Sequence, residues 1–100
     1  MPLAKCVWVD AKSYVVATGR TAAALTSTEF CIFQYVRHHS KPRIAAIADA
    51  LYRGVGNPPL YPYEVVRVTV LRLNAKLERL GIKVACEVHR TKSFYEIVTL

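Results

Sequence analysis

The chain has 100 residues, 53% of them hydrophobic and 21% charged, which suits one folded domain with a modest core and excludes a disordered chain. No apolar run reaches the ~18 residues of a membrane-spanning helix, and the N-terminus lacks the pattern of a secretory signal. The formal net charge of +7, from 14 Lys and Arg against 7 Asp and Glu, indicates attraction to a polyanion, either nucleic acid or an anionic membrane surface.

The cysteines bear on the compartment. Cys6, Cys31 and Cys86 are widely spaced and form no C-x-x-C pair. A secreted domain of this size usually carries an even, paired set of cysteines. The odd number favours a reducing compartment, and we expect the protein to be cytoplasmic.

The segment 5–24 is predicted to form a small antiparallel sheet. Two stretches rich in β-branched and aromatic residues, 6–9 and 14–17, flank a turn-like Asp-Ala-Lys-Ser sequence. Gly19 suits a second turn, and a third strand is expected at 20–24.

The start of the first helix has the strongest local signal in the chain. Thr26 followed by Glu29 three residues later forms a T-x-x-E capping box. Leu25 before the cap and Phe30 at the fourth helical position supply the hydrophobic staple that often accompanies such a box. The basic run 37–39 suits the C-terminal end of this helix.

Two more helices follow. Apolar residues at i, i+3 and i+7 predict the second over 43–53, and the Gly- and Pro-rich segment 54–59 ends it. The third is expected over 62–80, with Pro62 as its first residue and Gly81 just past its end. Its apolar face has the spacing 4-3-4-3 and consists of Val66, Val70, Leu73, Leu77 and Leu80.

The tail returns to a strand pattern. Residues 82–88 and 94–98 are predicted as two strands joined by a five-residue basic tip at 89–93. Two helices, a breaker loop, a long helix and a hairpin form a winged helix-turn-helix. The prediction is one α+β domain over 1–100, composed of an N-terminal antiparallel sheet (5–24), three helices (26–80) and a C-terminal β-hairpin wing (82–98).

Four short segments follow a family pattern. Residues 25–36 open with L-T-S-T-E-F, and residues 47–52 read I-A-D-A-L-Y. Residues 66–77 read V-R-V-T-V-L-R-L-N-A-K-L, and residues 94–97 read F-Y-E-I. In this order they resemble the effector domain of OmpR/PhoB-type response regulators, whose patterns are L-T-x-x-E-F-x-L-L-x-x-L, L-x-D-x-V-W, V-D-V-H-I-S-R-L-R-x-K-L and G-Y-R-L.

The resemblance spans about residues 5–98 and implies a sequence-specific, double-stranded DNA-binding transcriptional regulator without a cofactor or a membrane partner. Its third helix would enter the major groove. Arg72 matches a family arginine, and its guanidinium can make two bonds to guanine; the alternative is an ordinary solvated arginine. Val68 matches an apolar position that can approach a thymine methyl, or it packs in the core. The expected recognition-helix contacts are Arg67, Val68, Thr69, Arg72 and Lys76.

Cations outside the third helix supply further expected contacts. Arg90 and Lys92 on the hairpin tip are placed to reach the minor groove or the phosphates, although a solubilising loop has the same composition. Lys41 and Arg43, at the start of the second helix, are phosphate candidates together with exposed backbone N–H groups.

The chain also departs from the family pattern. Glu64-Val65 replaces the Arg-Thr that opens the recognition helix, Arg67 replaces an Asp, and Asn74 replaces an Arg. The hairpin lacks the usual glycines, and the 100 residues contain no receiver domain. We therefore expect a standalone effector domain with an altered DNA-reading surface.

A protein-interaction module is the alternative function. Leu71 stands where the family has a polar residue, and with Ala75 and Val68 it forms an apolar strip on the expected DNA face. This strip would serve a homodimer or another protein. The loop 54–61 falls where the family contacts RNA polymerase, and the family usually binds repeated half-sites as dimers. The resemblance places the protein in a bacterium, an archaeon or a phage, associated with the nucleoid.

Catalytic and metal-binding patterns are weak. His38 and His39 are adjacent, so on a helix they point about 100° apart. Cys86 and His89 supply two ligands where a structural zinc site needs four. No nucleophile–base pair, phosphate-binding glycine loop or carboxylate pair is evident, so we expect neither an enzyme nor a metal site.

Overall fold

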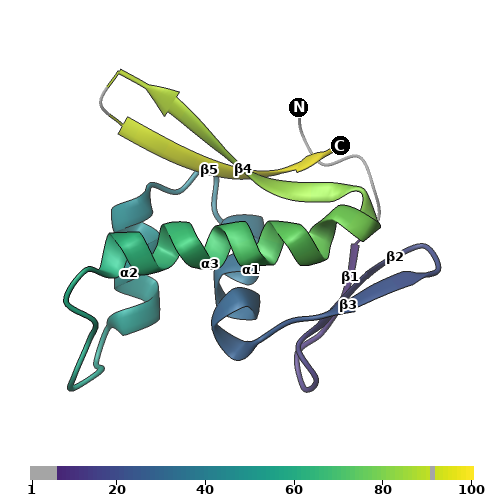
Figure 1. Cartoon of the computed structure of the whole chain (residues 1–100), viewed down its shortest axis with the longest axis horizontal. Coiled ribbons are helices and arrows are strands. Elements are labelled where there is room, and N and C mark those ends of the chain that lie inside the picture. The colour runs from purple at the N-terminus through teal and green to yellow at the C-terminus, as the bar shows by residue number, and fades with distance from the viewer. Residues whose placement is uncertain (1–6, 91) are drawn as a thin grey trace.

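A computed structural model describes residues 7–90 and 92–100 of the chain (Figure 1). The predicted α+β class is confirmed, because an N-terminal sheet is followed by three α-helices and a C-terminal hairpin. The elements in chain order are β1 (Val7–Asp10), β2 (Val15–Thr18), β3 (Thr21–Ala24), α1 (Ser27–His38), α2 (Ile44–Tyr52), α3 (Pro62–Leu77), the 3-10 helix η1 (Glu78–Leu80), β4 (Ile82–His89) and β5 (Lys92–Thr99).

The N-terminal sheet has three antiparallel strands in the order β1-β2-β3, as the sequence predicts for its described part. Its first turn is held by Asp10, whose carboxylate accepts hydrogen bonds from the backbone N–H of Lys12 (3.0 Å) and the hydroxyl of Ser13 (2.8 Å). These bonds lower the pKa of Asp10 below its ordinary value. Residues 5 and 6 of the predicted sheet lie outside the described residues.

The capping box at the start of α1 is confirmed in both directions. Thr26 Oγ1 accepts from the N–H of Glu29 at 3.2 Å, and Glu29 Oε1 accepts from the N–H of Thr26 at 2.8 Å. Two N–H groups that the first helical turn leaves without a helical partner are thereby satisfied.

The third helix differs from its prediction at its end. α3 begins at Pro62 as expected, but the predicted last turn, Glu78–Leu80, is a 3-10 helix, so continuous α-helix to residue 80 is wrong. The N–H of Gly81 donates to the carbonyl of Glu78 (2.9 Å), three residues back, which tightens this turn. Gly81 has a φ of 73°, a left-handed conformation that a side chain would disfavour.

The hairpin also differs from its prediction. β4 and β5 are antiparallel and pair as far as His89 and Lys92, so the predicted five-residue tip is wrong. His89 and Lys92 both belong to the paired strands, and Arg90 lies in the turn. Arg90 has a φ of 60°, which suits the two-residue turns that match the twist of paired strands. The chain contains no glycine there to signal such a turn.

One hydrophobic core joins these elements. Thr18 Oγ1 donates to the carbonyl of Leu80 (3.0 Å) and so fastens the N-terminal sheet to the end of the long helix. The N–H of Tyr95 donates to the carbonyl of Pro42 (2.9 Å), which fastens β5 to the start of α2. The largest fully buried side chains are Val16, Ile32, Phe33, Ile47, Val66, Leu73, Leu77, Leu80, Ile82 and Val84.

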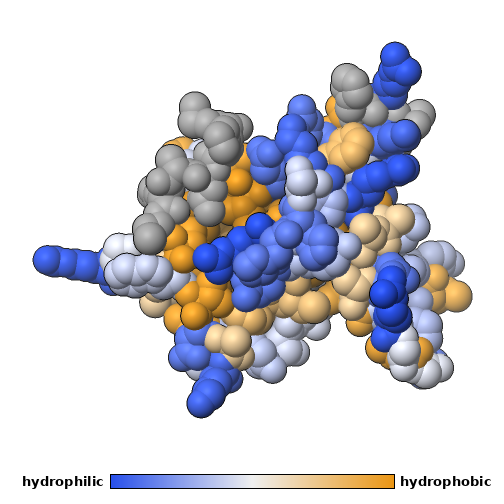
Figure 2. Space-filling model, turned by 180° about the vertical axis from the view of Figure 1, so that it is seen from behind, coloured by the Kyte–Doolittle hydropathy of each residue, from blue (hydrophilic) through white to orange (hydrophobic). Residues whose placement is uncertain are grey.

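The arrangement leaves the hairpin projecting from the body. Figure 1 shows α3 in front of α1, with the hairpin above both and the N-terminal sheet at one end. Seen from the opposite side, hydrophilic residues gather at the projecting end of the hairpin, while hydrophobic residues reach the surface in the middle of the molecule (Figure 2).

Candidate nucleic-acid interface

α3 is packed on one side and open on the other. Its inner face contacts α1, α2 and β4 and consists of Val66, Val70, Leu73 and Leu77. Positions about half a turn away point to solvent, because successive residues on a helix are about 100° apart. Leu71 is 71% exposed and Val68 41% exposed, and Arg72 and Ala75 are exposed beside them. Arg72 therefore shares one outward face with the apolar strip of Val68, Leu71 and Ala75.

Polar side chains on α3 are mostly engaged within the protein. Arg67 Nη1 lies 3.0 Å from Glu64 Oε1, and both side chains are exposed. Thr69 Oγ1 donates to the carbonyl of Val65 at 2.6 Å, one turn back. Arg72 differs, because the described residues include no hydrogen-bond or ion-pair partner for its side chain. It is thus available to an external ligand.

Lys76 forms the most buried ion pair recorded for α3. Its Nζ lies 2.6 Å from Glu29 Oε1, the same oxygen that accepts the capping hydrogen bond of α1. Burial alone would raise the pKa of Glu29, but the hydrogen bond and charge of Lys76, with the bonds of Thr26, hold it below its ordinary value. Lys76 therefore fastens α3 to α1, and its predicted contact with DNA stays a prediction.

Asn74 attaches α3 to the hairpin. Its Nδ2 donates to the carbonyl of Val84 (2.9 Å), and its Oδ1 accepts from the N–H of the same residue (2.8 Å). The side-chain amide thus satisfies both free backbone groups of Val84 on the edge of β4, as a neighbouring strand would. Asn74, at a position where the OmpR/PhoB-type pattern has an arginine, therefore has a structural role.

The hairpin carries two expected contact residues. Arg90 and Lys92 are both exposed, Arg90 in the turn and Lys92 at the start of β5. Val88 on β4 is exposed as well.

A shallow groove between α3 and the hairpin is lined by Arg67, Val70, Leu71, Asn74, Lys83, Val84, Ala85, Cys86, Val88, Ser93 and Tyr95. Burial, with a smaller contribution from the Cys86 thiol, raises the pKa of Tyr95 to about 12.

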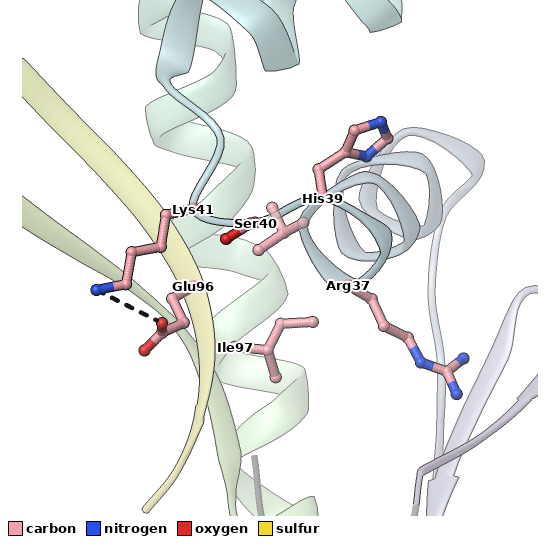
Figure 3. A pocket seen from close by; sticks show the side chains of 7 residues that line it. Arg37, His39, Ser40, Lys41, Glu96 and Ile97 are labelled. Carbon is pink, nitrogen blue, oxygen red and sulfur yellow. Dashed lines mark ion pairs between the residues drawn. The ribbon is translucent and has the colours of Figure 1, made fainter. Parts of the chain in front are cut away.

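The phosphate candidates lie in the segment between α1 and α2. Lys41 Nζ is 3.8 Å from Glu87 Oε2 and 4.0 Å from Glu96 Oε2, so two carboxylates already compensate its charge. In Figure 3 Lys41 and Glu96 point toward each other, whereas Arg37 and His39 point away from them. Arg43 is exposed and is the N-cap residue of α2, without a side-chain capping bond.

A second groove runs beside the first turns of α3. Its walls include Pro59, Leu60 and Tyr61 from the preceding loop, with Val68 and Arg72 from the helix. Leu60 is 82% exposed and Tyr61 69% exposed. Sequence reasoning placed this loop near a polymerase contact but gave no sign of how much apolar surface it presents.

The described residues hold neither a metal cluster nor a membrane-spanning helix. Within 7–90 and 92–100, no three His, Cys, Asp or Glu side chains are grouped so as to hold a metal ion. None of the helices in that part of the chain has the length and hydropathy to cross a bilayer. Cys31 and Cys86 are free and exposed, and Cys6 lies outside the described residues.

Sequence reasoning missed the partners of two residues. The capping box marked Glu29, but nothing in the sequence connects it to Lys76, which is 47 positions away. Asn74 was seen only as a missing arginine, although a short amide facing a strand edge satisfies an N–H and a carbonyl together. Helical spacing alone predicts that Arg72 and Leu71 project from the same face of the helix.

The chain has a neighbour among solved structures, although no family model and no curated protein matches its sequence. Among solved structures, the chain is similar to the DNA-binding domain of the response regulator AdeR, crystallised in complex with an intercistronic region. The TM-score is 0.67 at 21% sequence identity, and the match covers 98% of this chain and 99% of the other. This chain has the winged-helix fold of response-regulator DNA-binding domains.

Proposed function

We propose that this domain is a sequence-specific, double-stranded DNA-binding transcriptional regulator, with α3 in the major groove and the hairpin on the minor groove or the phosphates. The main support is the outward face of α3, which is exposed to solvent and includes Arg72, whose side chain has no partner among the described residues. A major groove admits an α-helix, and a guanidinium recognises guanine there by two parallel bonds.

Two further observations support the proposal. The net charge of +7 favours a polyanion, and the cations Arg90 and Lys92 project on the hairpin beside α3. The similar AdeR domain was crystallised with an intercistronic region, which is a precedent for this fold.

Selection from random duplexes tests the proposal. Electrophoretic mobility shifts at about 0.1–0.15 M salt should enrich a sequence motif. Arg72→Ala should then weaken binding by about 1–3 kcal/mol and relax the preference at one base pair, because one bidentate contact is lost.

Arg20→Ala is the matched control, since Arg20 is an exposed arginine in the turn between β2 and β3. It should leave the motif and the specific affinity unchanged. No enriched motif would contradict sequence-specific binding. An equal loss on all sequences in Arg72→Ala would make Arg72 a phosphate contact.

Assembly and location follow from the same proposal. Binding as a homodimer to repeated half-sites would place two copies of α3 on one face of the duplex. Leu60 and Tyr61, exposed in the loop before α3, would be available to RNA polymerase. A regulator of this kind acts on the nucleoid in the cytoplasm. Further supporting contacts with the DNA are proposed for Arg67, Thr69, Lys41 and Arg43.

A protein-interaction module is the second candidate. The exposure of Leu71, Leu60 and Tyr61 favours it, because apolar patches on a protein surface often mark interfaces. Light scattering with and without DNA separates the two functions. Loss of self-association in Leu71→Glu, with DNA binding intact, would favour the protein interface.

A further inference from the structure

The outward face of α3 offers few polar groups for reading bases. Asn74 is bonded twice to Val84, Lys76 is paired with the buried Glu29, and the hydroxyl of Thr69 is bonded to its own helix. The ion pair of Arg67 is exposed, so this arginine can exchange its carboxylate for a phosphate at little cost. Between residues 64 and 76, Arg72 is the cation without a recorded partner in the described chain.

The rest of that face is apolar. Val68, Leu71 and Ala75 are spaced i, i+3 and i+7, so they form one strip along α3. On the helix surface Val68 and Ala75 lie between Leu71 and Arg72, which makes the guanidinium one edge of the strip. From residue 68 to residue 75 the strip is about 10 Å long, comparable to three base steps of a duplex.

The major groove contains one apolar base substituent, the C5-methyl group of thymine. We propose that Leu71, extended by Ala75, contacts thymine methyl groups that lie beside a guanine bound by Arg72, so that the target half-site is rich in thymine next to this guanine. This inference rests on the proposed DNA binding and assigns the bases that it selects.

The energetic reason lies in the exposure of Leu71. Leu71 is 71% exposed, so its side chain contributes little hydrophobic stabilisation to the folded protein. Most of its apolar surface is available to be buried against a ligand. Removing one methyl group from such a buried contact should weaken binding about fourfold, the factor equivalent to one buried methyl or methylene.

Uracil in place of thymine tests the inference without altering the protein. With the full chain and the selected duplex, each contacted thymine replaced by deoxyuridine should weaken binding about fourfold, since only the methyl group is removed. Deoxyuridine outside the half-site is the matched control and should change nothing. Leu71→Ser should bind more weakly and lose its sensitivity to deoxyuridine at one or more positions.

Leu100→Ser is the control variant, since Leu100 is also exposed but belongs to the end of the chain. A specific motif that deoxyuridine does not weaken would overturn the methyl contact and leave the proposed function standing. Failure to enrich any motif would overturn both. Unchanged DNA affinity in Leu71→Ser together with lost self-association would overturn the inference in favour of a protein interface.

Discussion

At the scale of single residues, Glu29 joins two parts of the structure. One of its carboxylate oxygens accepts the N–H of Thr26 at the start of α1 and the ammonium of Lys76 on α3. The oxygen is buried, so both bonds form in a medium where charged hydrogen bonds are strong. Glu29 thus connects the start of α1 to α3, the helix that also carries Arg72.

Glu29→Gln should lower the free energy of unfolding by about 1–3 kcal/mol near neutral pH, because the charge that Lys76 faces is lost. The pKa of Glu29 is lowered in the folded state. Its contribution is therefore present above the ordinary glutamate pKa and lost as the pH falls through the lower folded value. Urea titrations of both proteins from pH 7 to pH 3 should show the difference shrinking.

Glu78→Gln is the control, because Glu78 is exposed in η1. It should cost little at any pH. A Glu29→Gln penalty of the same size at pH 3 and pH 7 would show that packing, and not the ionised pair, is responsible.

At the scale of elements, the contact of α3 with the hairpin depends on Asn74. The edge of β4 presents the N–H and carbonyl of Val84 toward α3, and the Asn74 amide satisfies both. At Val84 the strand edge is therefore not open to another chain, and this contact attaches the hairpin to α3. The expected contacts Arg90 and Lys92 are therefore on a hairpin that is attached to α3 through Asn74.

Asn74→Ala should destabilise the domain by about 2 kcal/mol, because two partly buried backbone groups lose their partners. Hydrogen exchange should accelerate at the N–H of Val84, whereas the capping N–H of Glu29 should exchange as before. Asn74→Asp keeps the acceptor for the N–H of Val84 and loses the donor to its carbonyl, so an intermediate effect is expected. Equal exchange in the wild type and Asn74→Ala would contradict the attachment.

The same scale shows how far sequence patterns reach. The helix starts were predictable from Thr26 and Pro62, because caps and first-turn prolines act within one turn. The hairpin turn was not, since Arg90 takes a positive φ without the glycine or asparagine that usually signals it. The early end of α3 was missed because Leu80 stays buried in the 3-10 turn, so its apolar spacing reads the same as in an α-helix.

At the scale of the whole molecule, the excess positive charge is the main long-range feature. The proposed DNA surface combines Arg72 on α3 with Arg90 and Lys92 on the hairpin, all of them exposed. Cations that replace counterions on DNA phosphates make binding dependent on salt. The two elements should therefore contribute differently, the helix to sequence preference and the hairpin to overall affinity.

The combined change of Arg90 and Lys92 to Gln should weaken binding to all duplexes alike. It should also reduce the slope of log K against log salt by about 2, since each lost phosphate contact contributes about 0.9. Changing Lys12 and Arg20 to Gln, in the turns of the N-terminal sheet, removes the same charge elsewhere and should leave the slope nearly unchanged. Equal slopes for the two double variants would show that net charge alone governs binding.

The sequence by itself determined the order of elements, the capping box and the inward and outward faces of α3, because these depend on residues at most one or a few turns apart. Only the tertiary structure decided which cations are free. Glu29 and Lys76 are 47 positions apart, and Lys41 lies near Glu87 on β4 and Glu96 on β5. Such pairs depend on how the chain closes around its core, whereas spacing along a helix or strand records local neighbours alone. That the guanidinium of Arg72 has no ion-pair partner among the described residues is therefore a consequence of the fold.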